Sequence, residues 1–366
     1  GVTSIGNSAF SGCSSLTDIT IPESVTNIED SAFEYCSSLT GITIPESVTS
    51  IERYAFRNCT GLKSITIPKS VESVGDKAFS GCTALTEVLL EGGSTLTSES
   101  FGEVADKVVT RWNEDSLIWT LAADGTMTIS GKWAMKDYRY SPAHQMRTSV
   151  RRVVIEDGVT SIGDNAFYDY TGLESIEIPS GVTSIGDFAF FDCTSLTNIT
   201  IPESVTSIGA SAFSWCYDLT GINIPESVTS IGGSAFGSCT SLTSINIPKS
   251  VTSIEHSAFY NCTGLTSIEI PDSVTSIGIG AFQDCSSLAS INIPSSVTSI
   301  GNCAFYNCTG LTSIEIPDSV TSIGIGAFQD CSSLASINIP SSVTSIGNCA
   351  FYNCTGLTSI EIPDSV

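Results

Sequence analysis

The chain has 366 residues, of which 41% are hydrophobic and 14% are charged, and its formal net charge is −24. This acidity excludes nucleic acid and anionic membrane surfaces as partners, because both would repel it. No run of about 18 apolar residues occurs, so we expect no direct membrane insertion by this segment.

From the N-terminus, the chain repeats a unit of 23 residues, which residues 16–38 represent as LTDITIPESVTNIEDSAFEYCSS. In this unit Ile19 and Ile21 alternate with polar residues, which is the periodicity of a half-buried β-strand. Pro22 ends the strand, because proline offers no N–H to a neighbouring strand. We therefore expect one short strand in each repeat.

The second half of the unit predicts another extended piece and then a turn. Val25 and Ile28 suit a second short strand, and Ala32, Phe33 and Cys36 suit one helical or 3₁₀ turn. About eight apolar side chains per repeat cannot form a core alone, but stacked coils can share one. The expected fold is a solenoid with a parallel β-sheet on one side, short strands and helical or 3₁₀ turns on the other, and coils about 4.8 Å apart.

The repeat decays after Leu90. Ser100-Phe101 stands one residue short of the expected Ala-Phe pair, so we assign residues 1–98 to a first array whose last repeat is decayed. Residues 99–149 then read as a linker and a small β joint that caps the second array. Within this joint, residues 118–121 and 127–129 predict two strands around the turn residues Asp124-Gly125.

The repeat resumes at Val150, and residues 150–366 form the predicted second array. Residues 153–366 contain one base, Lys249, against twenty Asp and Glu. A long segment whose charges are nearly all negative can steer a partner toward it, or it can keep a long stack of coils soluble. From Phe259 onward the sequence has a strict period of 46 residues, so two coils form one duplicated unit.

Twelve of the fourteen cysteines fall on the 23-residue lattice, which predicts a column of reduced, buried thiols and no disulfide framework. They are Cys13, Cys36, Cys59, Cys82, Cys193, Cys216, Cys239, Cys262, Cys285, Cys308, Cys331 and Cys354. Cys303 and Cys349 lie off this column, and we expect them to face solvent.

Sequence motifs for catalysis are absent. The chain has two histidines, no HExxH, no CxxC pairing, no P-loop and no G-x-S-x-G elbow. We therefore predict no catalytic residues, no cofactor and no metal site, and we interpret the chain as a protein that is not an enzyme.

The repeats resemble the BspA-like leucine-rich repeats of bacterial surface antigens, whose unit reads L-x-x-I-x-I-P-x-x-V-T-x-I-G-x-x-A-F-x-x-C. Residues 242–262, LTSINIPKSVTSIEHSAFYNC, match nearly every position of this unit. The resemblance covers about residues 1–90 and 150–366, and segments like 116–149 precede such arrays. It implies a leucine-rich repeat solenoid whose sheet lines a concave side. It also implies a bacterial cell-surface or secreted protein, with the signal and the anchor outside this fragment.

The exposed strand positions are the candidate binding face. One position per strand lies between the two isoleucines and faces outward under strand alternation. These candidates are Glu177, Asn223, Asn246, Glu269, Asn292, Glu315, Asn338 and Glu361. Aromatic residues follow the Ala-Phe pairs, where they either form an outer ridge or shield the turns: Tyr35, Tyr168, Phe191, Trp215, Tyr217, Tyr260, Tyr306 and Tyr352.

The resemblance and the repetition together predict adhesion, or binding of macromolecules, through a repetitive surface. The partner would be an unidentified protein or glycan, with host extracellular proteins among the candidates. Two alternatives stay open: a structural stalk that displays another domain, and an accessory domain of a surface enzyme.

Overall fold

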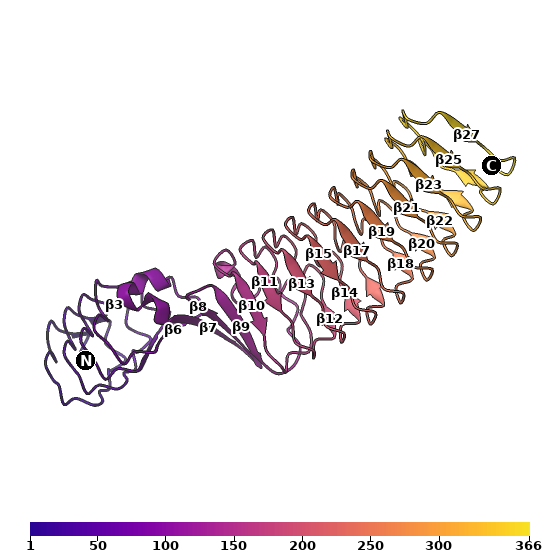
Figure 1. Cartoon of the computed structure of the whole chain (residues 1–366). Helices are drawn as coiled ribbons and strands as arrows, with labels where there is room; N and C mark the ends of the chain where they lie inside the picture. Colours follow the sequence, from indigo (N-terminus) through magenta and orange to yellow (C-terminus); the bar gives the residue numbers. More distant parts are fainter. The chain divides into compact units, whose positions relative to one another are not determined.

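The computed structural model describes all residues, 1–366, and divides into two compact units, Gly1–Ile129 and Ser130–Val366. Each unit is a stack of coils with short parallel strands, so the expected solenoid is confirmed (Figure 1). The division falls inside the segment 99–149 that the sequence marks as a joint. No helix is long and apolar enough to cross a membrane.

In the first unit, one sheet pairs the second short strand of each coil, with parallel register from Ser4↔Asn27 to Ser50↔Ser73. The other sheet begins as single bridges, Thr20↔Thr43 and Thr43↔Thr66, and becomes continuous at β4 and β6. The elements are β1 (Ser4–Ile5), β2 (Asn27–Ile28), β3 (Ser50–Ile51), β4 (Ser64–Ile67), β5 (Ser73–Val74), β6 (Glu87–Glu91), η1 (Ser98–Lys107), β7 (Val108–Glu114) and β8 (Leu117–Ala122), and β9 (Thr126–Gly131) crosses the division.

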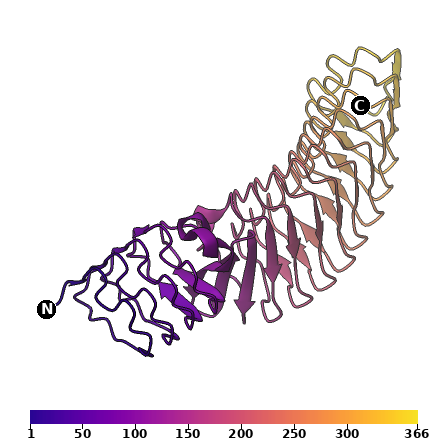
Figure 2. The same ribbon diagram turned by 60° about the vertical axis from the view of Figure 1, so that its left-hand side comes forward.

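The second unit repeats the same two sheets, which Figure 2 shows as parallel rows of short strands. The strands of the candidate face are β10 (Arg152–Ile155), β11 (Ser175–Glu177), β13 (Asn198–Thr200), β15 (Gly221–Asn223), β17 (Ser244–Asn246), β19 (Ser267–Glu269), β21 (Ser290–Asn292), β23 (Ser313–Glu315), β25 (Ser336–Asn338) and β27 (Ser359–Glu361).

The second sheet of this unit follows the proline of each coil, as the sequence predicts. Its strands are β12 (Ser184–Ile185), β14 (Ser207–Ile208), β16 (Ser230–Ile231), β18 (Ser253–Ile254), β20 (Ser276–Ile277), β22 (Ser299–Ile300), β24 (Ser322–Ile323) and β26 (Ser345–Ile346). The 3₁₀ segment η2 (His144–Met146) precedes the first coil.

The turn around each Ala-Phe pair differs from the expected helical turn. The Ala32 N–H bonds inside its own coil to Glu29 O (3.2 Å), but the Phe33 N–H bonds to Ala55 O of the next coil (2.8 Å). This alternation places Ser31 (φ 56°) and Tyr35 (φ 61°) in the left-handed region. A helix would use every N–H internally, whereas a stacked coil needs half of them for its neighbour.

The phenylalanines of the Ala-Phe pairs form the centre of the core. Phe33, Phe190, Phe213 and Phe282 are fully buried. Rings of successive coils stack face to face, for example Phe190 on Phe213 with centroids 5.3 Å apart. Phe101 of the decayed repeat continues this column at 6.0 Å from Phe79, so it serves the same core.

The cysteine column is confirmed for ten residues and wrong for two. The ten are buried, and their thiols donate to the phenylalanine carbonyl 26 residues earlier, for example Cys239 to Phe213 at 3.1 Å. Cys13 is exposed and Cys354 is half-buried, because the first and last coils have a neighbour on one side only. Cys349 is exposed and Cys303 is half-buried, and no disulfide joins any pair.

The predicted hairpin in the joint is also confirmed. β8 and β9 contain the expected segments 118–121 and 127–129, and the chain turns between them at Asp124 and Gly125. The Asp124 carboxylate accepts a hydrogen bond from the Thr126 N–H (2.8 Å) and thereby closes this turn.

Candidate binding surfaces

The strand face of the second unit brings the predicted candidates into one row. The middle isoleucine of each strand is buried or half-buried and both neighbours point outward, so the candidate Glu or Asn is exposed in every strand. Parallel register then sets each candidate beside the next, as in Asn246↔Glu269, Asn292↔Glu315 and Asn338↔Glu361. The sequence reasoning left out Thr200, which occupies the same row beside Asn223.

The glutamates of this row are not equivalent. Glu177 pairs with Arg152 of the preceding strand. Glu269, Glu315 and Glu361 have no base beside them. Along the row they alternate with asparagines, so that Glu269 lies beside Asn292, Glu315 beside Asn338, and Asn338 beside Glu361. Two strand spacings separate successive glutamates, which is about 10 Å. The duplicated coils therefore present free carboxylates at a fixed interval.

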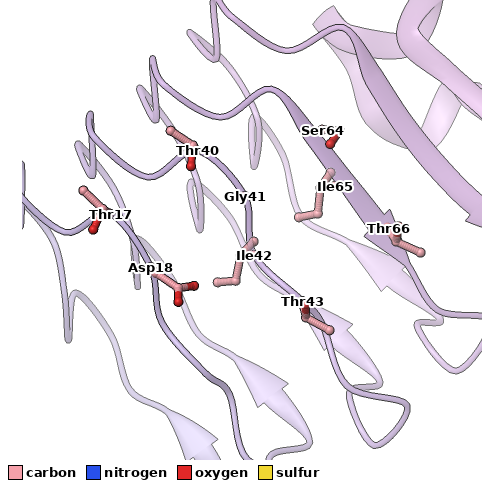
Figure 3. A pocket seen from close by; sticks show the side chains of 9 residues that line it. All are labelled: Thr17, Asp18, Thr40, Gly41, Ile42, Thr43, Ser64, Ile65 and Thr66. Atoms are coloured by element: carbon pink, nitrogen blue, oxygen red, sulfur yellow. The ribbon is translucent and has the colours of Figure 1, made fainter.

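The first unit has a shallow depression on its own strand face, with a volume of about 360 Å³ (Figure 3). Gly41 lies in it, and the space above this glycine is open, because a side chain at this position would meet no atom within 4 Å. Its walls come from three successive coils and consist of Thr17, Asp18, Thr40, Ile42, Thr43, Ser64, Ile65 and Thr66. Hydroxyls and one carboxylate can hydrogen-bond a polar ligand, and the only sequence signal for the depression is a glycine in an exposed strand column.

The aromatic residues that follow the Ala-Phe pairs lie at the outer turn surface. Five of the eight are exposed, namely Tyr35, Trp215, Tyr217, Tyr260 and Tyr352, and Tyr168, Phe191 and Tyr306 are half-buried. The structure thus gives this row accessible ring area, and the choice between an outer ridge and a shield stays a prediction.

The buried thiols have the wrong chemistry for a nucleophile. Burial raises the pKa of the Cys59 thiol to about 12 and that of Cys82 to about 11. Nucleophilic cysteines need the thiolate at working pH, which a lowered pKa provides. No group of three or more His, Cys, Asp or Glu side chains is placed to hold a metal ion.

A family model and solved structures of other proteins are similar to this chain. A family model described as a BspA type leucine-rich repeat region of six copies matches residues 1–105, 143–266 and 252–366. A crystal structure of a leucine-rich repeat protein from Bacteroides ovatus is similar over 98% of this chain and 87% of its own, with 32% identity and a TM-score of 0.58. A leucine-rich cell surface protein from Faecalibacterium prausnitzii is 31% identical over 94% of this chain and 87% of its own, with a TM-score of 0.45. No curated protein matches the chain.

Proposed function

The chain belongs to the BspA-type leucine-rich repeat family, and from this premise we propose that it is the adhesive array of a bacterial cell-surface or secreted protein. Its strand face would bind a macromolecular partner, an extracellular protein or a glycan, at many equivalent points. The observation that carries the proposal is the row of unpaired carboxylates, Glu269, Glu315 and Glu361, in strands of identical sequence.

A single such carboxylate would bind weakly, because an exposed ion pair contributes only about 0–1 kcal/mol. Several carboxylates at one interval act together when the partner also repeats, since each bound point raises the effective concentration of the next. The net charge of −24 favours a partner whose repeating groups are basic. Binding should therefore be salt-sensitive and multivalent.

The test measures binding of the whole chain to an immobilised polylysine surface and to immobilised extracellular matrix proteins. The triple variant Glu269→Gln, Glu315→Gln and Glu361→Gln removes the carboxylates of the row. The control variant Asp272→Asn, Asp318→Asn and Asp364→Asn removes three exposed carboxylates from the same coils and changes the net charge equally. We expect the first variant to bind at least about tenfold more weakly than the second.

A second test varies the number of copies. Deletion of residues 275–320 removes one duplicated unit of 46 residues and leaves the coil sequence in register. Affinity should fall with each unit removed. If affinity is unchanged by deletion and both triple variants bind alike, the adhesive proposal is wrong and the stalk becomes the better account, because a stalk only shortens.

A further inference from the structure

Four aromatic side chains form a cluster on the outer turn surface of three successive coils in the second unit. Tyr168 stacks on Phe191 with ring centroids 5.2 Å apart and an interplanar angle of 3°. Phe191 also contacts Phe188 (5.6 Å) and Trp215 (5.3 Å). Phe188 is 38% exposed and Trp215 is 44% exposed. Exposed apolar clusters of this kind mark interaction sites, and the core does not use these rings.

The first unit shows what the same turn positions can hold. There the guanidinium of Arg53 lies 4.3 Å from the ring centroid of Tyr54, and that of Arg57 lies 4.9 Å from it. Arg57 also forms an ion pair with Glu34 of the preceding coil, at 3.2 Å. The turn surface of this solenoid therefore accepts arginine side chains between an aromatic ring and a carboxylate.

The second unit has aromatic rings at these turn positions and lacks the arginines. The position of Glu34 holds Tyr168 there, and the acid next to the rings is Asp192, which follows Phe191. Counted from the Ala-Phe pair, Phe188 takes the position of Tyr54, Phe191 that of Arg57, and Asp187 that of Arg53. From residue 153 to the C-terminus the only base is Lys249, so the coils of Phe188, Phe191 and Trp215 contain no arginine that could cover the rings.

Of the three carboxylates next to these rings in the sequence, one has a basic partner and two have none. Asp169 follows Tyr168 and pairs with Arg147 at 2.7 Å. Asp192 follows Phe191 one coil later and has no base beside it, and Asp187 accepts a hydrogen bond only from the Ala210 N–H (2.6 Å). Partial burial and the neighbouring Asp169 raise the pKa of Asp192, which agrees with a carboxylate that has no counter-ion.

We propose that Phe188, Phe191, Trp215 and Asp192 form a binding site for arginine side chains of a polypeptide partner. The planar guanidinium would stack on the exposed rings, and Asp192 would be its counter-ion. Arginine fits better than lysine, because a planar guanidinium stacks on a ring face and keeps the N–H groups at its edge for two hydrogen bonds to a carboxylate. The site occurs once in the chain and lies on the turns, so it is separate from the repeated carboxylates of the strand face.

The experiment titrates the full chain into a fluorescein-labelled peptide of four Arg-Gly repeats and follows anisotropy. Peptides of four Lys-Gly or four Glu-Gly repeats are compared, and each variant's thermal unfolding is recorded. We expect the arginine peptide to bind most tightly. The double variant Phe188→Ala and Trp215→Ala should weaken it roughly tenfold, and Asp192→Asn roughly threefold.

Two controls locate the binding. Tyr260→Ala with Tyr352→Ala removes two exposed rings that stand alone on the same surface, and it should leave binding within about twofold. The variant Glu269→Gln, Glu315→Gln and Glu361→Gln should leave the preference for the arginine peptide over the lysine peptide unchanged, so this proposal can fail or hold independently of the adhesive proposal. Equal binding by the double aromatic variant would overturn the arginine site. Preference for a neutral oligosaccharide such as cellohexaose over the arginine peptide would overturn it as well.

Discussion

The turns of residues 29–57 and those of residues 259–351 have the same backbone and different surfaces. In both stretches phenylalanine rings stack, at 5.3 Å between Phe33 and Phe56 and at 5.4 Å between Phe282 and Phe305. The first stretch adds arginines that pair with an aromatic ring and a carboxylate. The duplicated stretch has no base at all.

The difference shows that this solenoid does not need side-chain ion pairs to stack. Its coils are joined by backbone hydrogen bonds, by ring stacking and by hydroxyl ladders, such as Ser227 donating to Val205 O at 2.7 Å. Each of these contacts repeats with the coil. The surface is therefore free to vary, and we look for function where it departs from the repeat.

The largest effect should come from the shared core. Phe213→Ala empties a fully buried site and should lower the free energy of unfolding by about 3–5 kcal/mol. The matched variant Phe188→Ala changes a phenylalanine two residues before the core Phe190 that is 38% exposed and contacts Phe191, and it should cost about 1 kcal/mol. Urea unfolding measures both, and a loss below about 1 kcal/mol for Phe213→Ala would show that the column is not core.

Alkaline pH should weaken the cysteine column. Burial raises the pKa of Cys59 to about 12 from 9.0, so the unfolded chain releases this proton first. Stability is then full below about pH 9 and falls as the pH rises toward 12, by about 1 kcal/mol per buried thiol at pH 10. Urea unfolding at pH 8 and pH 10 should show a smaller loss for Cys59→Ala than for the parent, and identical losses would contradict this.

The hydroxyl ladder should have a smaller effect. Ser227→Ala leaves the Val205 carbonyl without its serine partner and should cost about 1 kcal/mol. Thr229 donates to Thr206 O at 3.2 Å from an exposed position, so Thr229→Ala should cost less. If both variants unfold at the urea concentration of the parent, the hydroxyl ladders contribute no stability.

The smallest effect should come from the arginines that distinguish the first unit. Arg57→Ala removes a half-buried ion pair and a ring contact, and it should cost about 1 kcal/mol. Sodium chloride at 1 M should shrink this cost, because the Arg57 side chain is 39% exposed and salt screens charges that solvent reaches. A cost above about 2 kcal/mol would mean that ion pairs do support the stack.

The sequence alone determined the length of the repeat, and this length determined which residues of successive coils lie next to each other. A spacing of 23 residues places Phe33 beside Phe56 and Asn246 beside Glu269, because stacked coils bring residues i and i+23 together. The same spacing located the decayed repeat at Phe101 and the row of candidate glutamates. Each of these predictions needed only the order of residues along one coil.

Only the tertiary structure decided which side of the turn each residue occupies. Phe188 and Phe190 are two residues apart and chemically identical, yet one is exposed and the other is buried. The turn also replaced the expected helix, since half of its N–H groups bond to the next coil. Likewise, Cys13 shares the spacing of the buried thiols but lacks a covering coil. Burial depends on what the neighbouring coil places over a residue, and a repeat pattern names that neighbour without fixing the path of the turn.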